Sequence, residues 1–258
     1  MHHSELHEAL SSATIELRYQ PIVSLADRRP VALEALARLN HPVHGTLLPG
    51  AFVPQLEEAG LAAHLTDVVV GRALTDMASP LLRPHAFDIT LNFPLDVLLV
   101  PETLRRLDAQ RRAAGIPAER VVIELTESRP VEDLHLLADV LERLRGGGYR
   151  VLIDDVSPSM NRIPDLLDLP FTGVKLDRDV VQAVHTTPAI RAFAQRMIDR
   201  ARARQLSVVA EGVEDIATWQ RMHALGVDLA QGFLVARPLP PAAVPTWLEA
   251  WWNQPAFG

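Results

Sequence analysis

The sequence Tyr149-Arg150-Val151-Leu152-Ile153-Asp154-Asp155 is a short apolar run that ends in two adjacent carboxylates. Glycines precede it at 146–148 and a Ser/Pro segment follows it at 157–159, which are the boundaries of a buried β-strand. Two acids at the end of a buried strand are unfavourable unless a cation or a hydrogen-bond network compensates their charge. The partners of Asp154 and Asp155 must therefore come from elsewhere in the chain.

Strand-like and helix-like segments alternate along most of the sequence. Seven further runs are predicted to be strands, at residues 15–23, 31–39, 86–93, 121–126, 173–176, 206–211 and 229–234. Helices are predicted at residues 4–12, 49–59, 61–78, 101–114, 131–144, 163–167, 188–205, 215–225 and 241–251. Eight strands separated mostly by helices, in a chain of 258 residues, indicate a (β/α)8 barrel, which has about 250 residues.

The first two predicted strands depart from a regular barrel. Asp27-Arg28-Arg29-Pro30 joins them as a turn, whereas a parallel return would need a crossover of roughly a dozen residues or more. The pair is therefore predicted to be antiparallel. We predict an α/β protein with a modified TIM (β/α)8 barrel at residues 15–252, preceded by a lead-in at 1–14 and followed by a tail at 253–258.

Composition argues against several classes of protein. The chain has no cysteine, so disulfides, thiolate catalysis and cysteine-bound zinc are excluded. Its net charge of −7 and lack of a basic run argue against binding to long nucleic acid. A small anionic ligand remains compatible if a metal supplies positive charge. There is no signal-peptide core and no run of ~18 to 20 apolar residues, so a cytoplasmic protein without a membrane span is predicted.

Polar side chains recur where the predicted strands end. In chain order they are Glu34, Asn92, Glu124, Asp154, Asp155, Lys175, Glu211 and Gln231. Because the carboxyl ends of barrel strands meet at one mouth, these groups are expected to lie together. A single lysine cannot neutralise the acids. Oxygen ligands without cysteine favour Mg²⁺ or Mn²⁺, and a pair of ions would suit phosphodiester hydrolysis.

A less specific interpretation is that these acids are scattered at helix N-termini, where the helix dipole favours them. It suits any one acid, but it does not explain acids that recur within apolar runs such as Val-Ile-Glu-Leu and Leu-Ile-Asp-Asp. The ten histidines lack metal-binding spacings and are interpreted as surface or turn residues.

The sequence resembles EAL-domain proteins, a bacterial family of cyclic di-GMP phosphodiesterases and receptors. The motif that gives the family its name stands here as Glu34-Ala35-Leu36. Further matching segments are Tyr19-Gln20-Pro21-Ile22, Leu91-Asn92, Ile123-Glu124-Leu125-Thr126-Glu127, Ile153-Asp154-Asp155, Val174-Lys175-Leu176-Asp177-Arg178, Ala210-Glu211-Gly212-Val213-Glu214, Gln231-Gly232-Phe233 and Arg237-Pro238-Leu239. The resemblance implies a barrel whose first strand is antiparallel to the rest.

The resemblance also implies roles for individual residues. Metal ligands would be Glu34, Asn92, Glu124, Asp154 and Asp155, with two ions, Mg²⁺ or Mn²⁺. Glu211 would accept a proton or orient water, and Lys175 would contact the attacking water or the scissile phosphate, with Asp155 counted among the catalytic groups. Ligand contacts would come from Gln20, Arg38, Asp177, Glu214 and Gln231, and Glu127 would support the loop after the Asp pair. The implied reaction converts cyclic di-GMP to linear pGpG in signal transduction.

The segment Val156–Arg162 departs from the family pattern. Where active members usually have Phe-Gly-Thr-Gly-Tyr-Ser-Ser, this chain has Val-Ser-Pro-Ser-Met-Asn-Arg, with a proline and neither glycine. Two hypotheses follow: an active phosphodiesterase, since each ligand position is kept, or a cyclic di-GMP receptor with weak or no turnover. The resemblance further suggests a homodimer and a sensor or regulatory partner.

Overall fold

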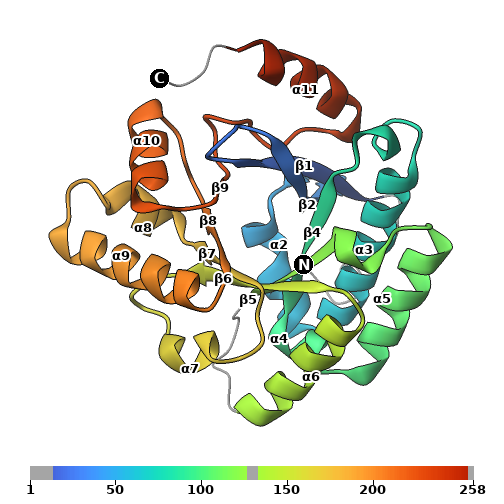
Figure 1. Cartoon of the computed structure of the whole chain (residues 1–258). Helices are drawn as coiled ribbons and strands as arrows, with labels where there is room; N and C mark the ends of the chain where they lie inside the picture. Colours follow the sequence, from blue (N-terminus) through green and yellow to red (C-terminus); the bar gives the residue numbers. More distant parts are fainter. Residues whose placement is uncertain (1–13, 127–132, 255–258) are drawn as a thin grey trace.

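The computed structural model describes residues 14–126 and 133–254. The predicted helix at 4–12 and Glu127 lie outside the described residues, as does the start of the helix predicted at 131–144. Figure 1 shows the strands in the middle of the molecule and the helices around them.

Eight strands form a closed barrel, as predicted. Their order around the ring is β1 (Ile15–Ser24), β9 (Leu229–Ala230), β8 (Ser207–Ala210), β7 (Gly173–Leu176), β6 (Arg150–Val156), β5 (Val121–Thr126), β4 (Asp88–Pro94) and β2 (Pro30–His41), and the β1–β2 pairing closes it. Strand β1 is antiparallel to both of its neighbours, and the other ring pairs are parallel. The predicted antiparallel first strand is therefore confirmed.

Helices separate the parallel strands. They are α2 (Pro49–Glu58), α3 (Ala62–Ala78), α4 (Leu95–Leu98), α5 (Pro101–Ala113), α6 (Leu134–Gly146), α7 (Ile163–Leu167), α8 (Arg178–Ala183), α9 (Pro188–Ala203), α10 (Ile216–Leu225) and α11 (Val244–Asn253). Three short 3-10 helices lie at Arg83–His85, Ala118–Arg120 and Pro241–Ala243. Helix α3 shows the expected period, since Leu65, Val69, Ala73 and Met77 are buried on one face.

Some elements differ from the prediction. The strand expected at 229–234 ends after Ala230. Beyond it, at Gly232, the chain passes so close to Val213 that a Cβ there would lie 2.1 Å from the Val213 carbonyl oxygen. Sequence patterns also missed helices α4 and α8 and the strand β3 (Gly45–Leu47), which pairs with β2 outside the ring. These elements are too short to show a period.

Helix α11, at the end of the chain, packs against the turn between β1 and β2. Trp251 is buried and donates its indole N–H to the carbonyl oxygen of Arg28 at 2.8 Å, while the Arg28 guanidinium lies 4.6 Å from the centre of a Trp251 ring. Trp251 is thus a packing residue, whereas the neighbouring Trp252 is 54% exposed.

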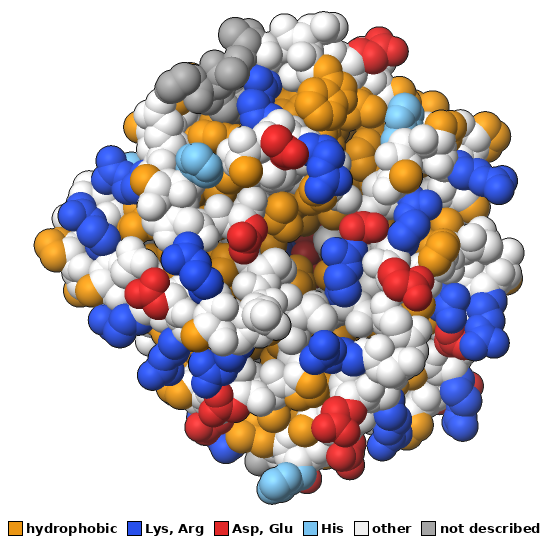
Figure 2. Space-filling model, in the orientation of Figure 1, with side chains coloured by type: hydrophobic (Ala, Val, Ile, Leu, Met, Phe, Trp, Pro, Cys, Tyr) orange, Lys and Arg blue, Asp and Glu red, His pale blue; other side chains and the backbone are white. Residues whose placement is uncertain are grey.

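On the face that Figure 2 shows, basic and acidic side chains are interspersed, and hydrophobic side chains gather in a hollow near the centre. No helix in the described ranges is long and apolar enough to cross a membrane.

Candidate active site

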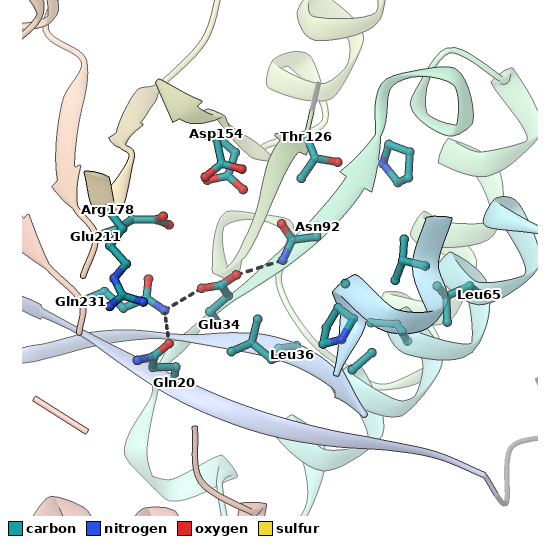
Figure 3. Close-up of a pocket in the computed structure, with 18 of the residues that line it drawn as sticks. Gln20, Glu34, Leu36, Leu65, Asn92, Thr126, Asp154, Arg178, Glu211 and Gln231 are labelled. Atoms are coloured by element: carbon teal, nitrogen blue, oxygen red, sulfur yellow. Dashed lines mark hydrogen bonds between the residues drawn. The ribbon is translucent and has the colours of Figure 1, made fainter. Parts of the chain in front are cut away.

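The polar groups predicted at strand ends converge at one mouth of the barrel. A cleft of about 620 Å³ opens there, and it is lined by Glu34, Asn92, Asp154, Asp155, Glu211 and Gln231 (Figure 3). Glu124 and Lys175 lie beneath this lining and are buried, with 0% and 1% exposure. The strand order therefore brings together groups that are far apart in sequence.

The two sides of the cleft differ in character. The acids and amides line one side, while Val53 of α2 and Leu65 and Val69 of α3 are among the side chains of an apolar wall. A cleft of this size, with an apolar wall and a few polar groups, is suited to a nucleotide-sized ligand.

Lys175 is the centre of the charged network. Its Nζ lies 2.5 Å from Oε1 of Glu211 and 3.1 Å from both Oε2 of Glu124 and Oδ1 of Asp154. Oε2 of Glu34 is farther away, at 3.7 Å. Burial alone would lower the pKa of Lys175, but the four surrounding carboxylates raise it well above its usual value. The ammonium is therefore charged throughout the physiological pH range.

Glu34 is held by two amides as well as by Lys175. Asn92 Nδ2 donates to Glu34 Oε1 at 2.9 Å, and Gln231 Nε2 donates to Glu34 Oε2 at 2.6 Å (Figure 3). Gln231 Nε2 also lies 3.1 Å from Oε1 of Gln20. Burial would raise the pKa of Glu34, but Lys175 and the two amides hold it below its usual range.

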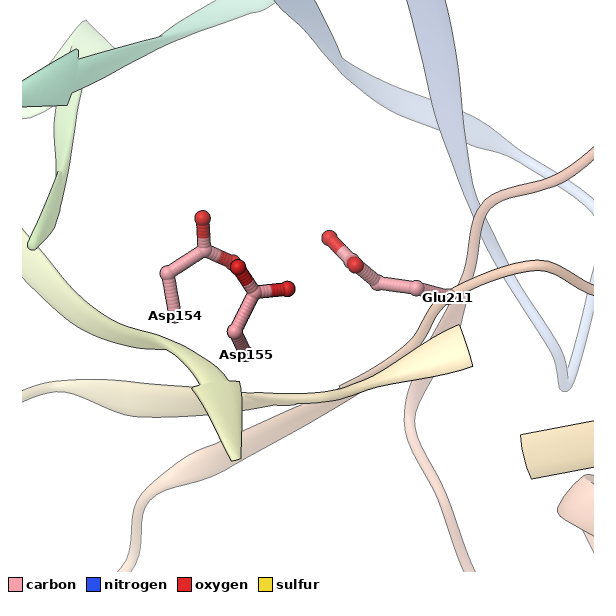
Figure 4. Close-up of side chains that lie close together, drawn as sticks. All are labelled: Asp154, Asp155 and Glu211. Atoms are coloured by element: carbon pink, nitrogen blue, oxygen red, sulfur yellow. The ribbon is translucent and has the colours of Figure 1, made fainter. Parts of the chain in front are cut away.

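Asp154 and Asp155 face the same site because strand β6 is irregular at its end. The pairing of β6 with β7 shifts register between Ile153 and Val156, and Asp155 has a φ of +52°, in the left-handed region. In a regular strand adjacent side chains point to opposite faces. The bend instead turns both carboxylates toward Glu211, as Figure 4 shows.

These three acids form a candidate metal cluster. Asp154, Asp155 and Glu211 each offer a ligand atom, and these atoms lie within 4.8 Å of one another. A second observation also fits a cation, since Oε1 of Glu124 is buried and has no hydrogen-bond partner. The predicted donors are oxygens, which suit a hard divalent ion.

Burial and mutual repulsion change how the acids titrate. Burial, reinforced by the charge of Asp154, raises the pKa of Asp155 to about 6. Burial also raises the pKa of Glu211 to about 8, although Lys175 opposes the shift. The pKa of Glu124 is raised well above its usual value, again chiefly by burial. Without a metal, the carboxyl groups of Asp155, Glu211 and Glu124 therefore hold protons more tightly than isolated carboxyl groups do.

The predicted ligand contacts are only partly brought together. Gln20, Glu214 and Gln231 line the cleft. Arg38 is not among the lining residues, and its Nη1 donates to the carbonyl oxygen of Ala37 at 2.8 Å. Asp177 is also absent from the lining, because its side chain caps helix α8 and accepts from the Asp179 amide at 2.8 Å.

Arg178 is a cleft residue to which the sequence reasoning gave no role. It lines the cleft and forms an ion pair with Glu214, with 2.8 Å between Nη2 and Oε1. Its aliphatic stem lies against Gly212, where a Cβ would come within 2.3 Å of the Arg178 Cγ. Gly212 also has a φ of +65°, so glycine is required there on two grounds. The matched segment Val174–Arg178 was the available signal.

Comparison with known proteins identifies the family of this chain. A profile of the EAL domain matches residues 3–238. The chain belongs to the EAL domain family. The cyclic di-GMP phosphodiesterase NbdA of Pseudomonas aeruginosa is 34% identical over 252 residues, which are 96% of this chain and 32% of that protein. The cyclic di-GMP phosphodiesterase PA2567 of the same organism is 30% identical over 90% of this chain and 40% of that protein.

Solved structures of the EAL family share this fold. The PaMucR phosphodiesterase in complex with c-di-GMP superposes with a TM-score of 0.84 at 28% identity, covering 92% of this chain and 96% of that one. This EAL domain spans about a third of the length of NbdA and 40% of that of PA2567, so these relatives contain further sequence.

Proposed function

We propose that this EAL domain is a metal-dependent phosphodiesterase that hydrolyses one phosphodiester bond of cyclic di-GMP and releases linear pGpG. The observation that carries the proposal is the approach of Asp154, Asp155 and Glu211 to within 4.8 Å beside the buried Lys175, at one side of a nucleotide-sized cleft. The two relatives named cyclic di-GMP phosphodiesterases support the same substrate and reaction.

The proposed metal ligands are Glu34, Asn92, Glu124, Asp154 and Asp155, and the proposed ions are two Mg²⁺ or Mn²⁺. The unpartnered Oε1 of Glu124 and the acidic cluster fit this set. Bound ions of this kind lower the pKa of a water and stabilise negative charge on phosphate oxygens.

The side chains of this chain have the following proposed roles. Glu211 accepts the proton of the attacking water, and its raised pKa of about 8 lies near the operating pH of a general base. The ammonium of Lys175 donates to that water or to a non-bridging phosphate oxygen. Gln231 and Asn92 hold the carboxylate of Glu34 in one orientation through their amide N–H groups.

Contacts to the ligand are proposed for Gln20, Arg38, Asp177, Glu214 and Gln231, with Arg38 at a phosphate. Arg38 and Asp177 do not line the cleft, so this part of the proposal requires them to move when the ligand binds. We add Arg178, the cationic side chain among the described residues that line the cleft. A loop-supporting role for Glu127 stays a prediction.

A cyclic di-GMP receptor with little or no turnover is the second candidate function. The observation in its favour is the loop after β6, which has a Ser157–Ser159 contact between hydroxyls at 2.8 Å and a left-handed Arg162 at φ +56°. Against it, the bend at Asp155 is formed without the family's glycines, and Val156 is buried and closes the β6–β7 pairing opposite Leu176. We therefore favour the enzyme.

The test is incubation of the purified protein with cyclic di-GMP and Mg²⁺ or Mn²⁺, followed by chromatographic separation of pGpG. Formation of pGpG that stops with EDTA is the expected result. Tight binding of cyclic di-GMP without formation of pGpG would contradict the enzyme and support the receptor. Absence of binding would contradict both functions. Wider elements of the proposal are a bacterial cytoplasmic location, a homodimer and a sensor or regulatory partner. The division into residues 1–14, 15–252 and 253–258 likewise stays a prediction.

A further inference from the structure

Lys175 is the only lysine in the 258-residue chain, in which every other basic side chain apart from histidine is an arginine. It is 1% exposed at the inner end of the proposed metal site. An ammonium is a compact point charge on a flexible stem, whereas a guanidinium is a planar fork. A compact ammonium suits a position on which carboxylates converge from several directions, which gives the lysine here a geometric reason.

Three carboxylates surround the ammonium of Lys175 at close range. Nζ donates to Oε2 of Glu124 at 3.1 Å, and it forms ion pairs with Oε1 of Glu211 at 2.5 Å and Oδ1 of Asp154 at 3.1 Å. The fourth acid, Glu34, lies at 3.7 Å and has its two oxygens bonded instead by Asn92 and Gln231. Lys175 is therefore placed as the shared counter-ion of these acids.

Lys175 and a divalent ion would share the same acids. Asp154 and Glu124 belong to the proposed metal ligands, and both lie 3.1 Å from the Lys175 Nζ. Ammonium and carboxylate oxygens approach to roughly 2.7–2.9 Å, whereas Mg²⁺ binds oxygen at roughly 2.0–2.1 Å. A bound ion would therefore compete with the ammonium for these carboxylates, and the two cations would repel each other.

We propose that Lys175 supplies the positive charge that neutralises the acidic site before metal binds, and that metal binding displaces its ammonium from Asp154 and Glu124. This role is additional to any contact with substrate. It rests on the metal site of the proposed function and not on hydrolysis, so its test contains no cyclic di-GMP.

The first experiment compares thermal unfolding of wild type and Lys175→Met in EDTA and in millimolar Mg²⁺. Methionine keeps the length of the side chain but removes the charge, which leaves the buried acids without a counter-ion. We expect Lys175→Met to unfold roughly 10 °C lower than wild type in EDTA. Mg²⁺ is expected to remove most of that difference and to bind the variant roughly tenfold more tightly in calorimetry, because one repelling charge is gone.

Two further variants make the comparison specific. Lys175→Met combined with Glu124→Gln removes one acid together with the cation, and is expected to unfold at a higher temperature in EDTA than Lys175→Met alone. Arg150→Met is the control. It breaks the ion pair with Asp88, which lies where strands β6 and β4 begin, whereas the acidic site lies where strands end. It is expected to show the same Mg²⁺ stabilisation and Mg²⁺ affinity as wild type.

The single lysine also allows a direct measurement. Protein labelled with 15N only in lysine side chains gives one Nζ resonance, and Mg²⁺ is expected to shift it in slow or intermediate exchange as the ammonium leaves Asp154 and Glu124. A resonance that does not respond to saturating Mg²⁺ would overturn the proposal. So would equal destabilisation of Lys175→Met in EDTA and Mg²⁺, or an unchanged Mg²⁺ affinity.

Failure to fold is also informative. If Lys175→Met folds in neither buffer, the test passes to the double variant Lys175→Met with Glu124→Gln. A double variant that is no more stable than Lys175→Met would show that Lys175 is not the counter-ion of these acids. If the variants and the resonance behave as expected but the wild-type protein forms no pGpG, the proposed hydrolysis is contradicted and the role of Lys175 as counter-ion stands.

Discussion

Nζ of Lys175 lies 2.5 Å from Oε1 of Glu211, so the proposed base is in direct contact with the only lysine of the chain. The contact orients the Glu211 carboxylate and, by its charge, opposes the rise in pKa that burial causes. The proton-accepting group is thus tuned by its neighbour and by its depth in the barrel mouth.

Glu211→Gln should lower kcat by roughly 10²- to 10⁴-fold, because an amide cannot accept the proton of the attacking water. Binding of cyclic di-GMP should change little, since the side chain keeps its shape. Turnover is measured as pGpG formed and binding by calorimetry. Glu142→Gln, at an exposed position on α6, is the matched control. A Glu211→Gln enzyme within tenfold of wild type would show that another group accepts the proton.

Glu34→Ala should abolish turnover and weaken Mn²⁺ or Mg²⁺ binding by at least roughly tenfold. The change removes a carboxylate that two amides and Lys175 hold in place. Calorimetry with the ion alone separates loss of metal from loss of catalysis, and circular dichroism checks that the barrel is folded. Unchanged metal affinity would remove Glu34 from the ligand set.

The stability of the metal-free protein should fall as pH rises from about 4.5 to about 8. Glu211 and Asp155 have folded-state pKa values of about 8 and about 6, above their usual values, so the folded protein binds protons more tightly than the unfolded chain in this window. Stability that depends on those protons is lost as pH increases. Urea unfolding in EDTA checks this, and Glu211→Gln should show a smaller pH dependence. A slope as steep as that of wild type would contradict the assignment.

Arg178→Met should weaken cyclic di-GMP binding by roughly tenfold, because a charged hydrogen bond to phosphate is lost. Metal affinity should not change, since Arg178 pairs with Glu214 at the cleft wall and not with the acids around Lys175. Arg196→Met, on helix α9 away from the cleft lining, serves as the control. Equal binding by both variants would show that Arg178 makes no ligand contact.

The combined change Ser157→Gly, Pro158→Thr and Ser159→Gly should raise kcat if the loop after β6 limits turnover. Glycine at these positions gives the backbone access to conformations that proline excludes. The comparison is the steady-state rate of pGpG formation with saturating metal. An unchanged rate would indicate that the bend at Asp155 is already complete with the present loop.

Much of the barrel and its mouth could be predicted from the sequence because two strong signals agree. An apolar run that ends in an acid, such as the one before Asp154, predicts where a strand lies. It also predicts that the polar groups meet at the carboxyl ends of the strands. The turn at 27–30 fixes the direction of the first pair. These signals are local, and the closed ring follows from joining them in order.

Other features depend on contacts that a sequence does not display. The left-handed Asp155 is a tertiary effect, because alternation along β6 alone would point its side chain away from Asp154. In the sequence, the apolar residues of α2 and α3 that line the cleft cannot be told apart from residues of an ordinary helix core. Arg38 was matched by motif position, yet its Nη1 bonds to the neighbouring Ala37 carbonyl and the side chain does not line the cleft.

The pairing of β1 with β9 has a consequence for how the chain folds during synthesis. Val23 pairs with Ala230, and Tyr19 bridges to Leu239, so residues separated by more than two hundred positions must meet before the ring closes. Until then, β1 has an unpaired edge on the side that β9 later covers, and such edges favour aggregation. Contacts this distant also slow folding. This edge of β1 is therefore expected to stay open during synthesis until the segment around Leu239 has left the ribosome.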